Sequence, residues 1–132
     1  MTDILQKTDR QTKITRLSTV TALLVGMAYW AIAAGVLPTG LSTAEAPVAI
    51  PIVAGGCYVV GGLLIGLRKR GLLLTGAIVN TLVMGFFLSA YTNRPEVMFS
   101  AGGLLTKSLQ LLLEIGLIYL LTVDRKARRD VR

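Results

Sequence analysis

Four apolar stretches, each about as long as a lipid bilayer is thick, fill most of this chain of 132 residues. They occupy residues 17–37, 46–67, 71–91 and 98–123. A helix needs about 20 mostly apolar residues to cross the roughly 30 Å hydrocarbon core. Backbone polar groups inside lipid must be satisfied within the segment, which favours helices. The sequence therefore predicts an all-α integral membrane protein, a four-transmembrane-helix bundle made of two antiparallel hairpins.

The stretches leave room for a single membrane domain over residues 1–132, with basic tails at residues 1–16 and 124–132. The connector Arg68-Lys69-Arg70 is very short, so the second and third helices should be antiparallel neighbours. The basic amino-terminal tail and its apolar run, which includes Ala31-Ile32-Ala33, also resemble a secretory signal. That run is longer than a usual signal core, which favours an uncleaved first span.

Two connectors carry helix-start signals. Ser42 and Glu45 have the spacing of a capping box, which predicts that Ser42 caps the second helix. Asn93 and Glu96 have the same spacing. The fourth helix is therefore expected either to start outside the bilayer or to follow a short surface turn, with Gly102-Gly103 marking the break.

Charge is distributed very unevenly along the chain. Twelve of its 14 lysines and arginines lie in the two tails and in residues 68–70, whereas the connectors expected on the other side carry only Arg94. The positive-inside rule then predicts one orientation with both termini in the cytoplasm, in a prokaryotic plasma membrane. The basic segments should contact anionic lipid head groups. The net charge of +7 does not indicate nucleic-acid binding, because no aromatic side chains that could stack on bases lie among these charges.

The residue inventory favours a protein that is not an enzyme. The sequence has no histidine and one cysteine, Cys57, which is interpreted as a small packing residue. It offers no set of metal ligands and no nucleophile beside a base, so no metal, cofactor or catalytic residue is predicted. The glutamate that small four-span exporters carry in their first span is missing, as are the signatures of fluoride channels.

Small residues recur at helical spacing, and the chain contains 14 glycines. Such stripes allow helices in lipid to approach closely. They predict helix packing within the chain, and the alternative is a seam between copies in a homo-oligomer. The candidate packing residues are Gly55, Gly62 and Gly66 in the second span and Ala77, Thr81 and Gly85 in the third.

The fourth span carries an unusual polar face. Lys107, Gln110 and Glu114 point within about 60° of one another at 100° per residue. Asn80, Tyr58 and Glu114 each lie nine residues from the inner end of their span, roughly 13 Å of rise and close to the midplane. We therefore expect Asn80, and potentially Tyr58, to hydrogen-bond Glu114. Lys107 is expected either to reach toward the outer surface or to bond Gln110.

Two functions remain open at this point. The favoured one is a non-enzymatic accessory, structural or partner-binding membrane component, acting alone, as a homo-oligomer or with another membrane protein. In that case the polar face fixes helix order and rotation. The alternative is a small proton-coupled transporter or channel in which the intramembrane carboxylate of Glu114 titrates.

Overall fold

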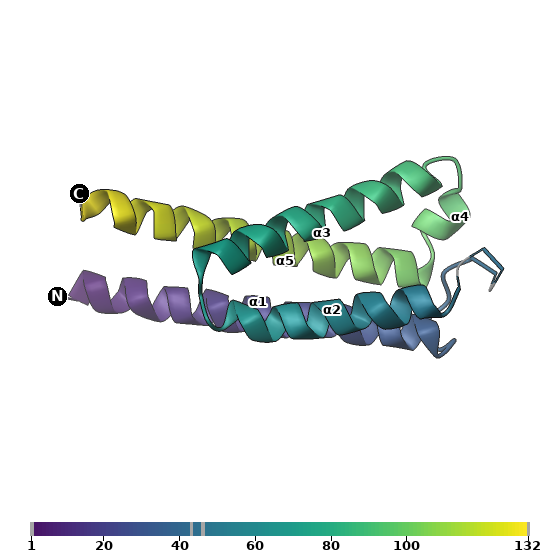
Figure 1. Cartoon of the computed structure of the whole chain (residues 1–132), viewed down its shortest axis with the longest axis horizontal. Coiled ribbons are helices and arrows are strands. Elements are labelled where there is room, and N and C mark those ends of the chain that lie inside the picture. The colour runs from purple at the N-terminus through teal and green to yellow at the C-terminus, as the bar shows by residue number, and fades with distance from the viewer. Residues whose placement is uncertain (1, 43, 46, 132) are drawn as a thin grey trace.

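The protein contains helices and no strands in the part of the chain that its computed structural model describes, which is residues 2–42, 44–45 and 47–131. The helices are α1 (Thr2–Ala33), α2 (Ala49–Ile65), α3 (Arg70–Tyr91), the short α4 (Pro95–Met98) and α5 (Ala101–Asp130). The four longer helices run side by side, and both termini lie at the same end of the molecule (Figure 1). We call this the terminal end, and the opposite end, which holds α4 and the longer connectors, the connector end.

Three helices, α1, α3 and α5, are long and apolar enough to cross a membrane. This length and composition indicate a membrane protein. The fourth apolar helix, α2, has 17 residues and is shorter than the predicted span 46–67. It rises about 26 Å, near the lower limit for a crossing helix.

Helix α1 is much longer than the predicted span 17–37, because the basic tail continues the same helix back to Thr2. Its surface turns carry an ion pair between Asp9 and Lys13, at 2.9 Å. At the other end, Gly35 adopts φ +77°. Hydrogen bonds from the N–H of Gly35 to Ile32 and from the N–H of Val36 to Ala31 complete a Schellman motif, which ends the helix before residue 37.

The capping box forms but does not start α2, so the sequence-based prediction for Ser42 is wrong. The Ser42 N–H and hydroxyl both bond Glu45 Oε2, at 2.9 and 3.0 Å, while the Glu45 N–H bonds Ser42. These contacts close an isolated turn, and the helix begins only at Ala49.

The second expected start signal also falls elsewhere. The residue at the N-cap position of the short helix α4 is Arg94 and not Asn93. The break before the last long helix comes at Ser100 and not at Gly102-Gly103. The Ser100 hydroxyl accepts a hydrogen bond from the Gly103 N–H at 3.0 Å and caps α5. Helix α5 then runs to Asp130, past the predicted end at residue 123.

Glycines bring α1 and α2 into close contact. A Cβ on Gly26 would lie 2.8 Å from the Gly55 carbonyl oxygen, and one on Gly55 would overlap the Trp30 ring. A Cβ on Gly62 would lie 3.1 Å from that of Ala22. By contrast, a Cβ on Gly66 would meet only Leu63 of the same helix, and one on Gly85 would meet no atom within 4 Å, so neither glycine lies at such a close approach between helices.

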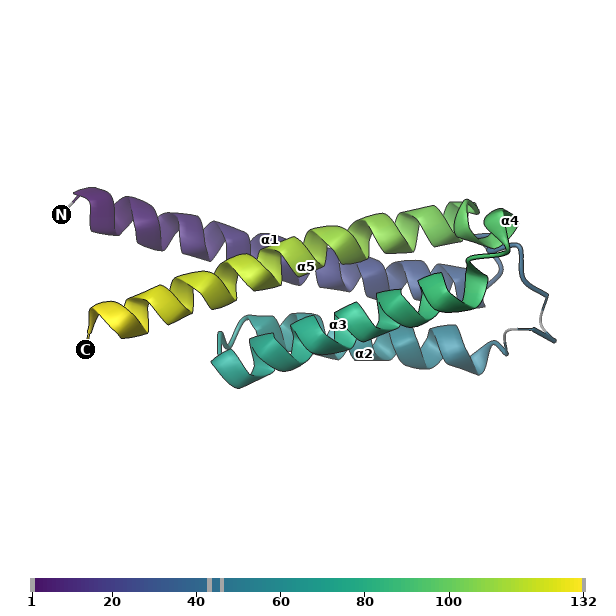
Figure 2. The ribbon, with the colours of Figure 1, turned by 90° about the horizontal axis from the view of Figure 1, so that it is seen from above.

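The apolar core lies where α5 meets α1 and α3. Leu113, Leu117 and Leu120 of α5 pack there with Leu73 and Ala77 of α3. Helices α1 and α5 cross near this core (Figure 2). Helix α3 buries only Leu73, Ala77 and Asn80, so one of its polar side chains is among the few residues that attach it to the bundle.

Candidate functional site: an intramembrane polar network

Asn80 is the centre of a polar network between the helices. Its side chain is 2% exposed. The amide nitrogen donates hydrogen bonds to Glu114 Oε2 at 2.8 Å and to the Gln110 carbonyl oxygen at 3.0 Å, both on α5. Its amide oxygen accepts a bond of 2.6 Å from the Tyr58 hydroxyl on α2. One side chain therefore joins three helices.

Gln110 is the second centre, and it is fully buried. Its amide nitrogen donates to the hydroxyl of Tyr58 at 2.6 Å and to that of Tyr29 at 3.2 Å. Its amide oxygen accepts a bond of 2.6 Å from Lys107 Nζ. Tyr29 stacks on Tyr58 with ring centroids 5.7 Å apart, which brings α1 into the same network.

The bonds between Lys107 and Glu114 all point the same way. Following the donors, Lys107 donates to Gln110, Gln110 to Tyr58, Tyr58 to Asn80, and Asn80 to Glu114. Each neutral group turns its acceptor toward the cation and its donor toward the carboxylate. Aligned hydrogen bonds polarise one another, so the chain stabilises both charges without a direct ion pair.

Such a chain is poorly suited to carrying protons. Two of its three neutral members, Gln110 and Asn80, are amides. The amide nitrogen only donates and the amide oxygen only accepts in their ordinary form, so neither takes up and releases a proton as a hydroxyl or imidazole does. The chain can transmit polarisation from Lys107 to Glu114, but a proton would need another route to the carboxylate.

The carboxylate of Glu114 is only partly buried. Its Oε1 accepts a hydrogen bond of 2.7 Å from the hydroxyl of Thr81, an exposed residue of α3. Glu114 and Thr81, together with Ala77, line a shallow depression of about 230 Å³ on the surface between α3 and α5. This end of the network therefore reaches the side of the bundle.

The cation of Lys107 lies at the other end, toward the connectors. Its Nζ lies 4.3 Å from the centroid of the Phe87 ring and 3.5 Å from the Tyr29 hydroxyl. It borders a cavity of about 410 Å³ at the connector end. Lys107 therefore reaches toward the connector end while its ammonium group bonds Gln110.

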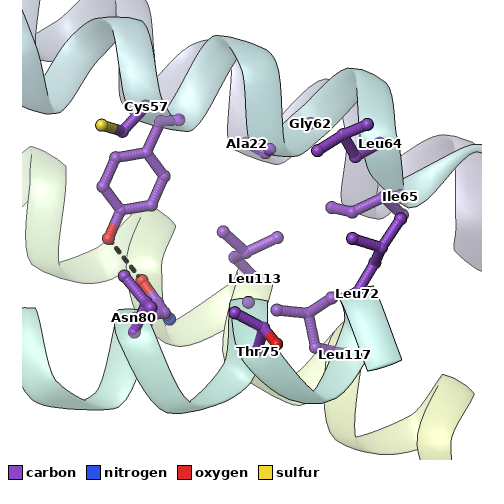
Figure 3. Close-up of a pocket in the computed structure, with 14 residues that line it drawn as sticks. Ala22, Cys57, Gly62, Leu64, Ile65, Leu72, Thr75, Asn80, Leu113 and Leu117 are labelled. Carbon is purple, nitrogen blue, oxygen red and sulfur yellow. Dashed lines mark hydrogen bonds between the residues drawn. The ribbon is translucent and has the colours of Figure 1, made fainter. Parts of the chain in front are cut away.

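A separate apolar cavity of about 220 Å³ lies between α2 and α3. Figure 3 shows Cys57 and Asn80 at one end of it and Ile65 and Leu72 at the other. Cys57 is exposed and unpaired within the described residues. The walls of this cavity are almost entirely apolar, and their polar side chains are Thr75, Asn80 and Tyr58.

Sequence reasoning placed some residues of this network and missed others. Tyr58 bonds Asn80 and Gln110 rather than Glu114 itself. Thr81 was predicted only as a packing residue, yet its hydroxyl is the second donor to Glu114. Tyr29 and Phe87 were not predicted at all. Only the depth of Tyr29, well inside the first apolar stretch, could have drawn attention to it.

A small cluster of ion pairs joins the two longer connectors at the connector end of the molecule. Arg94 bonds Glu45 at 2.6 Å and Glu96 at 2.8 Å. The backbone N–H of Ser42, followed by the guanidinium of Arg94, lowers the pKa of Glu45 from 4.5 to about 2. The described residues contain no group of three or more histidine, cysteine or acidic side chains that could hold a metal ion.

No protein-family model, curated protein or solved structure matches this chain.

Proposed function

We propose that the protein crosses a prokaryotic plasma membrane four times, with both termini in the cytoplasm. Two observations support this topology. The termini and the basic connector 66–69 all face the terminal end of the molecule (Figure 1), and twelve of the 14 basic residues belong to those segments or directly adjoin them. The 17 residues of α2 suffice for a thin crossing, and mismatch of a few ångströms is tolerated by lipid at modest cost.

Reporter fusions test this topology. A reporter enzyme that is active only in the periplasm should be inactive when it is fused to either terminus. The same enzyme should be active when it is inserted within residues 38–42. An enzyme that needs the cytoplasm should give the reverse pattern. Opposite locations for the two termini would mean an odd number of crossings and would refute the proposal.

Within that topology, we propose a non-enzymatic accessory or partner-binding membrane component, either a homo-oligomer or a subunit beside another membrane protein. The observation that supports it best is the closure of the polar network on itself. Lys107, Gln110, Tyr58, Asn80 and Glu114 all find partners within the chain, which is how buried networks fix one packing arrangement. The amides in the middle argue against a proton path through it.

The partner surface in this proposal is the open side of α3. That helix buries few residues, and Gly85 has no atom within 4 Å of an added Cβ. Exposed small residues allow another membrane helix to approach closely. Anionic lipids at the cytoplasmic face are the second partner, through the basic segments, and nucleic acid is not one.

A second candidate function, a proton-coupled carrier or channel, is favoured by one observation. The Glu114 carboxylate borders a depression at the side of the bundle, so it is not sealed inside the network. A carboxylate within a membrane helix is costly and often has a functional role. Protonation from that side would break the bond from Thr81 or Asn80 and loosen α3.

Glu114→Gln separates the two functions. If the protein is an accessory component, the variant should show reduced stability or reduced recovery of a co-purifying protein or homo-oligomer from mild detergent, with no pH-driven flux in either form. If it is a carrier, the variant should be present at normal abundance and lose a flux driven by a pH gradient in proteoliposomes. Gln keeps the size and shape of the side chain, but it removes the charge and replaces one of the two acceptor oxygens with a donor amide group.

A further inference from the structure

The connector-end cavity beneath the loops is a candidate binding site that goes beyond the proposed function. We propose that it binds an amphipathic anion, a carboxylate or phosphate attached to an apolar body, whose charged group pairs with Lys107. The cavity measures about 410 Å³, within the range of small-molecule sites. All four long helices and the connector after α1 contribute to its wall.

The charge of Lys107 is the first argument. Its direct acceptor is the neutral amide oxygen of Gln110, and the other contacts are an aromatic ring and a distant hydroxyl. No carboxylate among the described residues forms an ion pair with it. A cation in a low-dielectric setting is costly unless an opposite charge approaches it. An anion entering the cavity would supply that charge.

The second argument is the rim of the cavity. Glu45 also lines the cavity and would repel an anion if its charge were uncompensated. It is held instead by Arg94 and by the turn at Ser42. Arg94 therefore offsets the charge of Glu45, and Glu96, the second carboxylate on this arginine, is not among the residues that line the cavity. Lys107 is the cation that lines the cavity within the described residues.

The side chains that line the cavity determine the chemistry of the uncharged part of the ligand. Tyr29, Phe87 and Tyr91 supply aromatic surface, while Ile50 and Val83 supply aliphatic surface. One cation favours one negative charge, and the apolar walls favour a hydrocarbon or aromatic body. Either a soluble amphipathic acid or the phosphate and glycerol region of a lipid has this chemistry.

Binding to the purified full-length chain in an uncharged detergent tests the proposal. The soluble probe is phenylbutyrate, with phenylbutyramide as its neutral counterpart. The lipid probe is dioctanoyl phosphatidate, with dioctanoylglycerol as its neutral counterpart. At least one anion should raise the melting temperature in a saturable manner and more than its neutral counterpart. Saturation by phenylbutyrate supports a soluble ligand, and saturation by phosphatidate alone supports a lipid.

Four variants make the test specific. Lys107→Gln should weaken binding of the anion about tenfold or more, whereas Lys107→Arg should retain it. Val83→Phe should block the site by volume while leaving the charge in place. Val79→Phe, one turn away on the same helix and facing the other cavity, is its matched control and should bind normally.

The Val83 and Val79 pair keeps the test decisive if Lys107→Gln does not fold. Equal stabilisation by charged and neutral probes would overturn the proposal. So would equal anion affinity in Val83→Phe and Val79→Phe, or a folded Lys107→Gln that binds as tightly as the natural chain.

Discussion

Replacing Asn80 by leucine should destabilise the bundle by about 2 kcal/mol. The substitution keeps the size of the side chain and removes three hydrogen bonds, to Tyr58, to the Gln110 carbonyl and to Glu114. Hydrogen bonds between membrane helices average about 0.6 kcal/mol each, so the three together give roughly that total. Because Asn80 is 2% exposed, neither water nor lipid can replace its partners.

The unfolding free energy can be measured by titrating the detergent-solubilised protein with sodium dodecyl sulfate. Trp30 is the only tryptophan, and its indole donates a hydrogen bond to Ile52 on α2, so its fluorescence should report unfolding. Asn93→Leu is the control, because Asn93 lies exposed in a connector and the same change there should stay within about 0.5 kcal/mol. A loss at Asn80 no larger than that of the control would refute the reasoning.

A double-mutant cycle with Glu114→Gln sharpens the same prediction. The Asn80 amide nitrogen lies 2.8 Å from the carboxylate, so the two substitutions should be coupled by about 1 kcal/mol, within the range for residues in direct contact. Strictly additive losses in this titration would contradict the predicted coupling between Asn80 and Glu114.

Four further substitutions test other parts of the structure. Gly55→Ala should cost about 1–3 kcal/mol in the same titration because its Cβ overlaps α1, whereas Gly85→Ala, with open space around it, should be neutral or more stable by up to about 1 kcal/mol. Gly35→Val should cost roughly 1–2 kcal/mol, because φ +77° disfavours a branched side chain. The folded-state pKa of Glu45 is lowered to about 2, so its stabilising effect should be complete above pH 4.5 and disappear as the pH falls toward 2. Melting curves of the natural chain and Glu45→Gln should converge over that interval, and curves that stay parallel would count against the ion pair with Arg94.

The existence of the helices could be predicted from the sequence, but their ends could not. Long apolar stretches leave the backbone no alternative to helix in lipid. Helix ends depend on local capping instead. The predicted cap at Ser42 closes a separate turn, while Ser100 caps α5 without having been identified. Hydropathy also does not reveal that a basic tail continues the helix, as it does in α1.

The sequence predicted the depth of the network residues along their helices, but not how each helix is rotated about its own axis. Counting residues from the basic ends placed Asn80 and Glu114 at one level, and the structure joins them by a hydrogen bond. Counting does not fix how each helix is turned about its axis relative to its neighbours. That rotation depends on packing between helices, and it decides that Thr81 and Tyr29 take part in the network.

The order of the helices along the chain determines when the polar network can form during synthesis. Asn80 emerges from the ribosome well before Gln110 and Glu114, whose oxygens accept both hydrogen bonds from its amide nitrogen. Only the Tyr58 hydroxyl, which donates to the Asn80 amide oxygen, is synthesised earlier. The glycine-lined hairpin of α1 and α2 can therefore settle early, while α3 waits in the lipid with an unsatisfied amide. A nascent chain cut short before α5 would leave the Asn80 amide nitrogen without its two acceptors, so α5 completes both the polar network and the attachment of α3.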